Sequence, residues 1–475
     1  MLLIPLIVLL PLAFLVPLAL LGKRYSFAIS AISAVAELAL VIAAMALARV
    51  FGFAALSASF AYLPSIGIGL SFGMNAFTQV LALMTSVVMA AAALSARNFI
   101  KESQKLYNAL LLLISASTFG VFLAGNFVML YVFWEISEIA MFFVIYAFGG
   151  YNRRYASIKF LIFSLASSML LLIGIMLIYS GLPAHTFDIG TALSTAKLIP
   201  QGMQTLILSL LLLSFMIKMP VFPLHAWLPD AYSEAPASGT MVLAGAMAKF
   251  GGYGMLLAFL MLPVASQYSA YIAIIFAFSA VYAGFVAIRQ ANLKTALAYA
   301  SMVDMGIVAL GLSAGNALGY AGALYAMFSH GIVIALMFLI AGTLDESFGT
   351  VLISKLRGVA KSMSSIAYSF LFGSFAMLGI PLTSGFIGDL LVFSGAVHAF
   401  GPVFLAPLLG LVLIGLFMFW LAERVFFNTS RAVEPYRQEP RSALYAVLLL
   451  ACATIIIGVM PALFMPQISA ALAAI

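Results

Sequence analysis

The sequence predicts an all-α polytopic membrane protein with about fourteen transmembrane helices. Of the 475 residues, 65% are hydrophobic and only 7% are charged, whereas a soluble domain carries about 25% charged residues. Apolar runs near 20 residues recur along the whole chain, which is about the length that crosses a ~30 Å hydrocarbon core. These runs are apolar on every face and do not alternate as barrel strands do, so each span is predicted to be a helix.

The individual spans follow from these apolar runs and the turns between them. The predicted spans are residues 2–21, 27–48, 72–95, 106–124, 126–148, 157–180, 203–224, 237–262, 270–288, 294–314, 317–343, 363–393, 402–422 and 442–463. The first lacks a preceding positive stretch, so we interpret it as a membrane helix and not as a signal peptide. The single cysteine, Cys452, excludes an internal disulfide and any multi-cysteine iron–sulfur or zinc site.

The cationic residues test the number of spans independently. Seventeen of the 21 lysines and arginines fall in odd-numbered loops. If the number of spans were wrong, these cations would be spread over odd- and even-numbered loops alike. They are Lys23, Arg24, Arg97, Lys101, Lys105, Arg153, Arg154, Lys159, Arg289, Lys294, Lys355, Arg357, Lys361, Arg424, Arg431, Arg437 and Arg441. The positive-inside rule then predicts a multi-pass protein of the cell's inner (cytoplasmic) membrane with both termini outside. The net charge of +7 therefore reports topology and does not indicate nucleic-acid binding.

Ionisable residues inside the predicted spans are the main functional signal, because each costs several kcal/mol at mid-bilayer. The candidates are Glu135, Glu138, Lys218, Lys249, Asp304, His330 and Asp389, spread over spans 5 to 12. Taken singly, His330 or Asp304 has a structural explanation, and Glu135 with the two lysines fits a static ion-pair set. Together, acids, lysines and a histidine are what a proton relay requires. Glu37, which belongs to no motif, is interpreted as a locally hydrogen-bonded or interfacial side chain and not as a relay member.

Two spans carry helix breakers near their ionisable residues. Residues 215–229 of span 7 hold three prolines after Lys218, and residues 379–389 of span 12 hold Pro381 shortly before Asp389. Backbone groups freed by proline are tolerated at membrane depth only inside protein or beside water. Broken helices five spans apart are typical of an inverted repeat in a transporter.

These features divide the chain into four predicted parts. They are an N-terminal three-helix region (1–105), a first repeat of spans 4–8 (106–262), a second repeat of spans 9–13 (270–422) and a C-terminal helix (423–475). Five spans are an odd number, so the second repeat is inverted relative to the first.

The motifs around these residues resemble the antiporter-like subunits shared by proton-pumping NADH:quinone oxidoreductase (complex I), membrane-bound hydrogenases and multisubunit cation/proton antiporters. The matching segments are Phe133-Trp-Glu135, Lys218-Met-Pro220, His225-Ala-Trp-Leu-Pro-Asp-Ala-Tyr-Ser-Glu-Ala-Pro236, Ala246-Met-Ala-Lys249, Lys294-Thr-Ala-Leu-Ala-Tyr-Ala-Ser301, Ser329-His330-Gly331 and Ser384-Gly-Phe-Ile-Gly-Asp389. They cover roughly residues 105–395, in order and on the expected spans.

The resemblance implies a proton-translocating membrane subunit of a redox-driven ion-pumping complex. Glu135 would pair with Lys218, and Lys249 would be the central relay lysine. His330 would be the next link and Asp389 the exit residue. Lysine suits such a relay because burial makes it release its proton, whereas arginine stays charged.

The sequence departs from the family at three positions. Asp389 stands where the family usually has Lys or Glu. In this respect the chain most resembles the complex I subunit that has an acidic residue in span 12. Asp304 replaces a His or a neutral residue, and Glu138 adds a second carboxylate to span 5. Both are predicted to be auxiliary members of the relay.

Cofactor and partner expectations follow from the same motifs. Haem, flavin and iron–sulfur ligation patterns are absent, so we expect no cofactor and no metal in this subunit. The expected partners are other membrane subunits, a peripheral redox arm reached through them, and the lipid bilayer.

Two other functions remain open at this stage. One is a subunit of a multisubunit Na⁺/H⁺ antiporter without redox chemistry, in which Asp304, Asp389 and the broken-helix backbone would coordinate Na⁺. The other is a structural anchor whose charges are vestigial. An enzyme acting on lipid or peptide is disfavoured, because HExxH and GxSxG motifs are absent.

Overall fold

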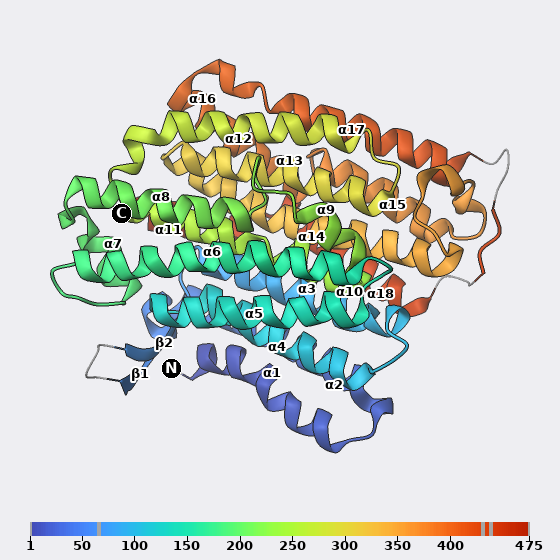
Figure 1. Cartoon of the computed structure of the whole chain (residues 1–475), viewed down its shortest axis with the longest axis horizontal. Helices are drawn as coiled ribbons and strands as arrows, with labels where there is room; N and C mark the ends of the chain where they lie inside the picture. Colours follow the sequence, from blue (N-terminus) through green and yellow to red (C-terminus); the bar gives the residue numbers. More distant parts are fainter. Residues whose placement is uncertain (1, 64–67, 429–432, 437–439, 474–475) are drawn as a thin grey trace.

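The computed structural model describes residues 2–63, 68–428, 433–436 and 440–473, which form a bundle of long, roughly parallel or antiparallel helices (Figure 1). The helices that precede the first repeat are α1 (Leu3–Leu20), α2 (Ser26–Phe51) and α3 (Thr78–Phe99). The predicted first repeat, called the first repeat below, holds α4 (Gln104–Leu123), α5 (Phe127–Phe148), α6 (Arg153–Gly181), α7 (Ile189–Thr195), α8 (Gln201–Lys218), α9 (Leu228–Glu234), α10 (Ala237–Val242) and α11 (Lys249–Met261). The second repeat and the C-terminal part hold α12 (Ala265–Ala287), α13 (Leu293–Ser313), α14 (Ala317–Phe348), α15 (Ser364–Met377), α16 (Ser384–Phe400), α17 (Leu408–Leu421), α18 (Arg441–Val459) and α19 (Met465–Ala473).

The predicted all-α membrane fold with about fourteen spans is confirmed. Among the described residues, thirteen helical segments are long and apolar enough to cross a membrane. The shorter apolar helices α15 and α16 flank a break and together make up the remaining predicted span.

The loops gather at two ends of the bundle, as the cation parity predicts. Lys105 donates to the Ala19 carbonyl and Val433 N donates to the Arg357 carbonyl, so odd-numbered loops contact one another. We call this the basic end; two of its predicted cations, Arg431 and Arg437, lie outside the described residues.

The opposite end holds the even-numbered loops. Gly125 N donates to Ser71 O, and Phe127 N donates to Phe187 O, which ties loops 2, 4 and 6 together. Both ends of the chain are also found here, at the left of Figure 1. We call this the termini end. An even number of spans is what returns the chain to the side on which it began.

The loop before α3 is more structured than predicted. Strands β1 (Ser57–Leu63) and β2 (Ile68–Gly73) pair antiparallel, and α3 begins at Thr78, not at residue 72. The Asn75 carboxamide oxygen accepts hydrogen bonds from the Phe77 and Thr78 N–H groups at 2.9 Å, which fixes the start of the helix. Hydropathy alone does not reveal this capping interaction, so the predicted span begins too early.

The two predicted breaks are present, and the structure adds two π-helical segments that the sequence did not predict. Residues 219–227 separate α8 from α9, and residues 378–383 separate α15 from α16. The π-helical segments are Leu243–Met247, immediately before α11, and Ala422–Phe427, after α17. Span 8 is therefore not the uniform helix that its apolar composition indicates.

Helix α14 is the core of the bundle. It packs against α3, α10, α13, α16 and α18, and its apolar window is entirely buried, as is that of the α10–α11 segment. A helix apolar on every face is expected in such a position, since no side of it meets water or lipid. The central position of α14 allows one side chain on it to reach both repeats.

Candidate functional site

Lys218 and Glu138 form a buried ion pair in the first repeat. Lys218 is the last residue of α8, and its Nζ lies 2.8 Å from Oε1 of Glu138 on α5. The two side chains are only 2% and 1% exposed. The same Oε1 accepts a hydrogen bond from Trp134 Nε1 at 2.9 Å, one turn earlier on α5. A charge pair this deep stays intact only because its members neutralise each other.

Aromatic rings surround the Lys218 ammonium on its other sides. Nζ lies 5.8 Å from the ring centroid of Trp134 and 5.6 Å from those of Phe160 and Phe250. These rings add cation–π attraction but no negative charge. Glu138 is thus the only ion-pair partner of Lys218 within the described chain.

The predicted pairing of Lys218 with Glu135 is wrong. The two glutamates lie three residues apart, which moves the second about 4.5 Å along the helix axis. The Lys218 side chain, at the end of α8, reaches the carboxylate of Glu138. The hydrogen bond from Trp134 fixes the orientation of that carboxylate. Glu135 is only partly buried and lies near the Tyr131 hydroxyl. Glu138, predicted as an auxiliary, is the direct counter-ion.

The break after α8 is stabilised by contacts from outside the helix. The Phe222 N–H donates to Ser279 Oγ of α12 at 3.1 Å, and Trp227 Nε1 donates to the Ile217 carbonyl at 2.9 Å. These hydrogen bonds pair backbone N–H and C=O groups that the proline-containing segment cannot pair within itself. The break therefore persists inside protein and fixes where the Lys218 side chain begins.

Lys249 is fully buried at the start of α11, directly after the π-helical segment. Its Nζ donates to the Ala244 carbonyl at 2.6 Å and lies 2.6 Å from His330 Nδ1. No carboxylate lies within ion-pair distance of Lys249 in the described residues. A π turn is common at functional sites, and here it presents a backbone carbonyl to the lysine.

His330 on α14 joins the two repeats. Its Nδ1 faces Lys249, and its Nε2 lies 2.9 Å from Ser301 Oγ and 4.0 Å from Asp304 Oδ2, both on α13. The tautomer with the proton on Nε2 fits these contacts, since Nδ1 then accepts from the ammonium. The imidazole can take a proton on one side and release it on the other.

Two glycines bring these helices close enough for that contact. A methyl group on Gly245 would lie 2.8 Å from the Gly331 carbonyl oxygen, and one on Gly331 would lie 2.6 Å from the Gly245 carbonyl oxygen. Only residues without a side chain fit this crossing of α14 over the π-helical segment. The crossing lies next to His330 and sets its distance to Lys249.

Asp304 and Asp389 line a small cavity beside His330. Its volume is about 20 Å³, enough for roughly one water molecule. The Asp389 carboxylate packs against the second break: a methyl group on Gly379, whose φ is +67°, would lie 2.6 Å from Asp389 Oδ2. Ser329, at the same cavity, accepts a hydrogen bond from Ser384 at 2.9 Å.

The candidate residues therefore form two groups. Lys218 and Glu138 make one group, and a second group comprises Lys249, His330, Asp304 and Asp389. Phe250 connects them, because it follows Lys249 in the chain and its ring packs over the Lys218 ammonium. The motif that ends at Ser301 predicts no role for this hydroxyl; its hydrogen bond to His330 follows only from the fold.

A polar cavity of about 330 Å³ opens among the loops of the basic end. The Asn152 N–H donates to Glu234 Oε2 at 2.9 Å, and Lys294 Nζ lies 2.7 Å from Asp345 Oδ2. Glu234, Lys294 and Asp345 line this cavity, at the basic-end termini of α9, α13 and α14. Helices of both predicted repeats therefore contribute to it.

Glu37 lies apart from both groups. It is fully buried on α2, its Oε1 accepts from Ser33 Oγ at 2.7 Å, and its Oε2 accepts from Ser115 Oγ. The prediction of a locally hydrogen-bonded side chain is confirmed.

An all-helical bundle with two broken helices, and with buried lysines, acids and a histidine beside them, defines a membrane protein of the ion-translocating class. The chain belongs to the family described as NADH:quinone oxidoreductase/Mrp antiporter, TM, whose model matches residues 124–416. This confirms the resemblance carried by the motifs.

Known relatives agree with this assignment. The chain is 34% identical over 386 residues to NAD(P)H-quinone oxidoreductase chain 4 1 of Synechococcus sp. (strain JA-3-3Ab), covering 79% of this chain and 72% of that protein. It is 34% identical over 380 residues to F(420)H(2) dehydrogenase subunit M of Methanosarcina mazei, covering 78% and 76%. A chain of respiratory complex I from Thermus thermophilus with bound NADH superposes with a TM-score of 0.91 at 27% identity, covering 99% of both chains.

Proposed function

We propose that this chain is the proton-translocating membrane subunit of a redox-driven ion-pumping complex. Its similarity to membrane subunits of quinone-linked and F420H2-linked dehydrogenases supports the redox drive. The single observation that carries the proposal is the Lys249–His330 contact, which links the two repeats by two side chains that can both exchange a proton.

The first step is the release of a proton from the first repeat. The Lys218 ammonium is stable at this depth because Glu138 neutralises it. If a neighbouring subunit separates the pair, the isolated ammonium is left in a low-dielectric site and gives up its proton. Breaking a buried pair costs about 3–5 kcal/mol, which equals moving one proton against roughly 130–220 mV at about 2.3 kcal/mol per 100 mV.

The second step carries the proton across the second repeat. In this proposal Lys249 takes up the proton that Lys218 releases and transfers its own to His330 Nδ1, and His330 releases the proton on Nε2 toward Ser301 and Asp304. The water-sized cavity then connects Asp304 with Asp389, which acts as the exit residue. Proton uptake occurs from the polar cavity at the basic end.

The redox chemistry belongs to other subunits in this proposal. We place no cofactor and no metal in this chain, and energy arrives from membrane subunits that connect it to a peripheral redox arm. The relatives differ in electron donor, so the donor is a property of that arm. The basic end faces the cytoplasm and both termini face outside the inner membrane, in line with the positive-inside rule.

The test uses the whole complex, purified and reconstituted into liposomes, with proton uptake and electron transfer recorded together. Lys249→Met is expected to lower the number of protons moved per electron while electron transfer continues. Lys197→Met, which removes an exposed lysine at the termini end, is the matched control and should leave the ratio unchanged. An unchanged ratio in Lys249→Met contradicts the proposal.

A second candidate is a Na⁺/H⁺ antiporter subunit without redox chemistry. It draws on one observation, that Asp304, Asp389 and Ser329 place oxygen atoms around a single small cavity, and oxygen ligands suit Na⁺. Transport that requires Na⁺ at fixed pH and proceeds without an electron donor would favour this candidate. Transport that needs the donor and ignores Na⁺ would favour the redox-driven pump.

A further inference from the structure

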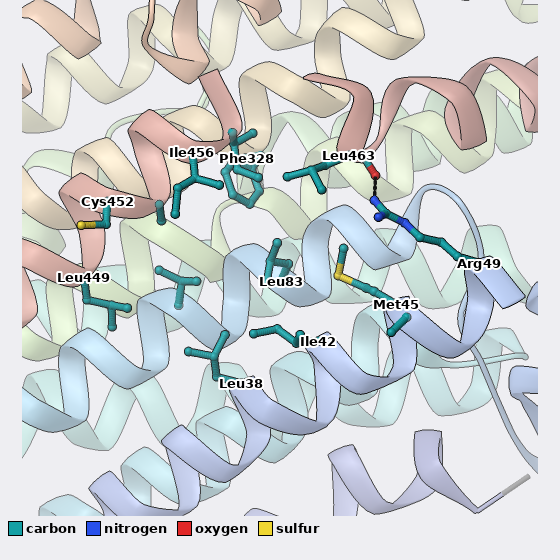
Figure 2. A pocket seen from close by; sticks show the side chains of 14 residues that line it. Leu38, Ile42, Met45, Arg49, Leu83, Phe328, Leu449, Cys452, Ile456 and Leu463 are labelled. Atoms are coloured by element: carbon teal, nitrogen blue, oxygen red, sulfur yellow. Dashed lines mark hydrogen bonds between the residues drawn. The ribbon is translucent and has the colours of Figure 1, made fainter. Parts of the chain in front are cut away.

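The described structure also has an apolar hollow that is lined by none of the relay residues. It has a volume of about 400 Å³ and runs between α2 and α18 over α3, with Phe328 of α14 in its floor (Figure 2). Figure 2 shows Arg49 and Leu463 at one end of this groove and Leu449 with Cys452 at the other. It serves no step of the proposed proton path.

The groove has the length of one membrane leaflet. Its residues on α2 extend from Leu38 to Arg49, a distance of about 16 Å at 1.5 Å per residue. Half of a ~30 Å hydrocarbon core is about 15 Å. Since Arg49 closes α2 at the termini end, the groove begins at that membrane boundary and ends near the middle of the bilayer.

A single cation lies at the boundary end of this apolar groove. The Arg49 guanidinium is exposed, and one of its N–H groups donates to the Leu463 carbonyl at 2.8 Å. No other hydrogen bond or ion pair of this guanidinium is found in the described chain, so donors remain free. An arginine at this depth, with free donors, is suited to bind a phosphate group.

We propose that this groove binds one acyl chain of a glycerophospholipid, whose phosphate is held by Arg49. The occupant comes from the leaflet at the termini end. The apolar walls fit a hydrocarbon chain, the length fits one leaflet, and the charge at the boundary fits an anionic head group.

The groove volume of about 400 Å³ lies in the range of small-ligand pockets, about 300–1,000 Å³.

The test uses the intact complex in liposomes that contain a small fraction of phosphatidylglycerol with a photoactivatable diazirine near the end of one acyl chain. After illumination, the crosslinked peptides are identified by mass spectrometry. We expect crosslinks concentrated on the deep groove residues of α2 and α18, such as Leu38 and Cys452. Crosslinks spread evenly over all lipid-facing helices would overturn the proposal.

Four variants separate the parts of the proposal. Ala46→Trp fills the groove from its exposed edge and should reduce groove crosslinking several-fold. Ala43→Trp, on the same helix but outside the groove, is the matched control and should leave it unchanged. Arg49→Gln should also reduce groove crosslinking several-fold, whereas Lys197→Gln should not. Equal crosslinking in all four variants contradicts a specific site.

Cys452 provides a second measurement, because it is the only cysteine of the chain and lines the groove. Alkylation of Cys452 by a membrane-soluble maleimide should slow when phosphatidylglycerol is added to the detergent-solubilised complex. Arg49→Gln should remove this protection. A crosslink from Cys452 to a neighbouring subunit would overturn the lipid assignment and make the groove a subunit interface.

Discussion

The two broken helices carry opposite electrostatic arrangements. In the first repeat the break follows Lys218, which is paired at 2.8 Å with Glu138 and enclosed by aromatic rings. In the second repeat the break precedes Asp389, which shares a water-sized cavity with a second acid and a histidine. The first break stabilises a charge, whereas the second places proton-exchanging groups around space for water.

This difference assigns separate tasks to the two repeats. Separating a neutralised buried ion pair requires an input of free energy, about 3–5 kcal/mol, and leaves an ammonium that gives up its proton readily. A set of groups connected by hydrogen bonds and a water-sized cavity can pass a proton with little movement. In this view the energy supplied by the complex separates the ion pair of the first repeat, and the second repeat conducts the protons.

The largest expected effect comes from breaking the pair in the first repeat. Glu138→Gln leaves Lys218 without its counter-ion, at a cost of about 3–5 kcal/mol, and should reduce proton transport at least tenfold. Glu135→Gln, one turn away, should reduce it less than threefold, because Glu135 makes no ion pair with Lys218. Proton uptake per electron in liposomes measures both.

Glu37→Gln is the control for this comparison, since it neutralises a buried carboxyl outside both groups. It should leave transport unchanged. If Glu135→Gln proved as damaging as Glu138→Gln, the two carboxylates would act as one unit and the assignment of the counter-ion would fail.

A smaller effect is expected from each acid of the second repeat. Asp304→Asn and Asp389→Asn each remove one of the two acids that line this cavity, so each should slow transport several-fold. The double variant should stop it, because the path beyond His330 then has no acid. Transport rates at saturating donor test this, and full activity of the double variant would contradict the exit through this cavity.

The smallest effect should come from Ser301→Ala. It removes one hydrogen bond to His330 Nε2, while Asp304 stays within reach of the imidazole. A loss of about 0.5 kcal/mol, the lower end for a hydrogen bond, should lower transport roughly twofold. Ser301→Thr keeps the hydroxyl and should restore most of the rate. Failure of Thr to do better than Ala would show that the hydroxyl contributes nothing.

Composition and charge parity predicted the span number, the grouping of loops and the positions of both breaks, because these depend on local hydropathy and on proline. The partner of Lys218 could not be predicted. Glu135 and Glu138 lie on one helix face three residues apart, and only the end point of α8 and the Trp134 hydrogen bond decide between them. The π-helical segment beside Lys249 was also missed, since its residues are as apolar as any helix.

The most direct test of the account is the proton-to-electron ratio of the reconstituted complex carrying His330→Leu. This variant removes a side chain that touches Lys249 and also lies within reach of Asp304. The account predicts continued electron transfer and a ratio lowered by the share of this subunit. An unchanged ratio would show that protons do not pass between the repeats through His330, and the relay as described here would be wrong.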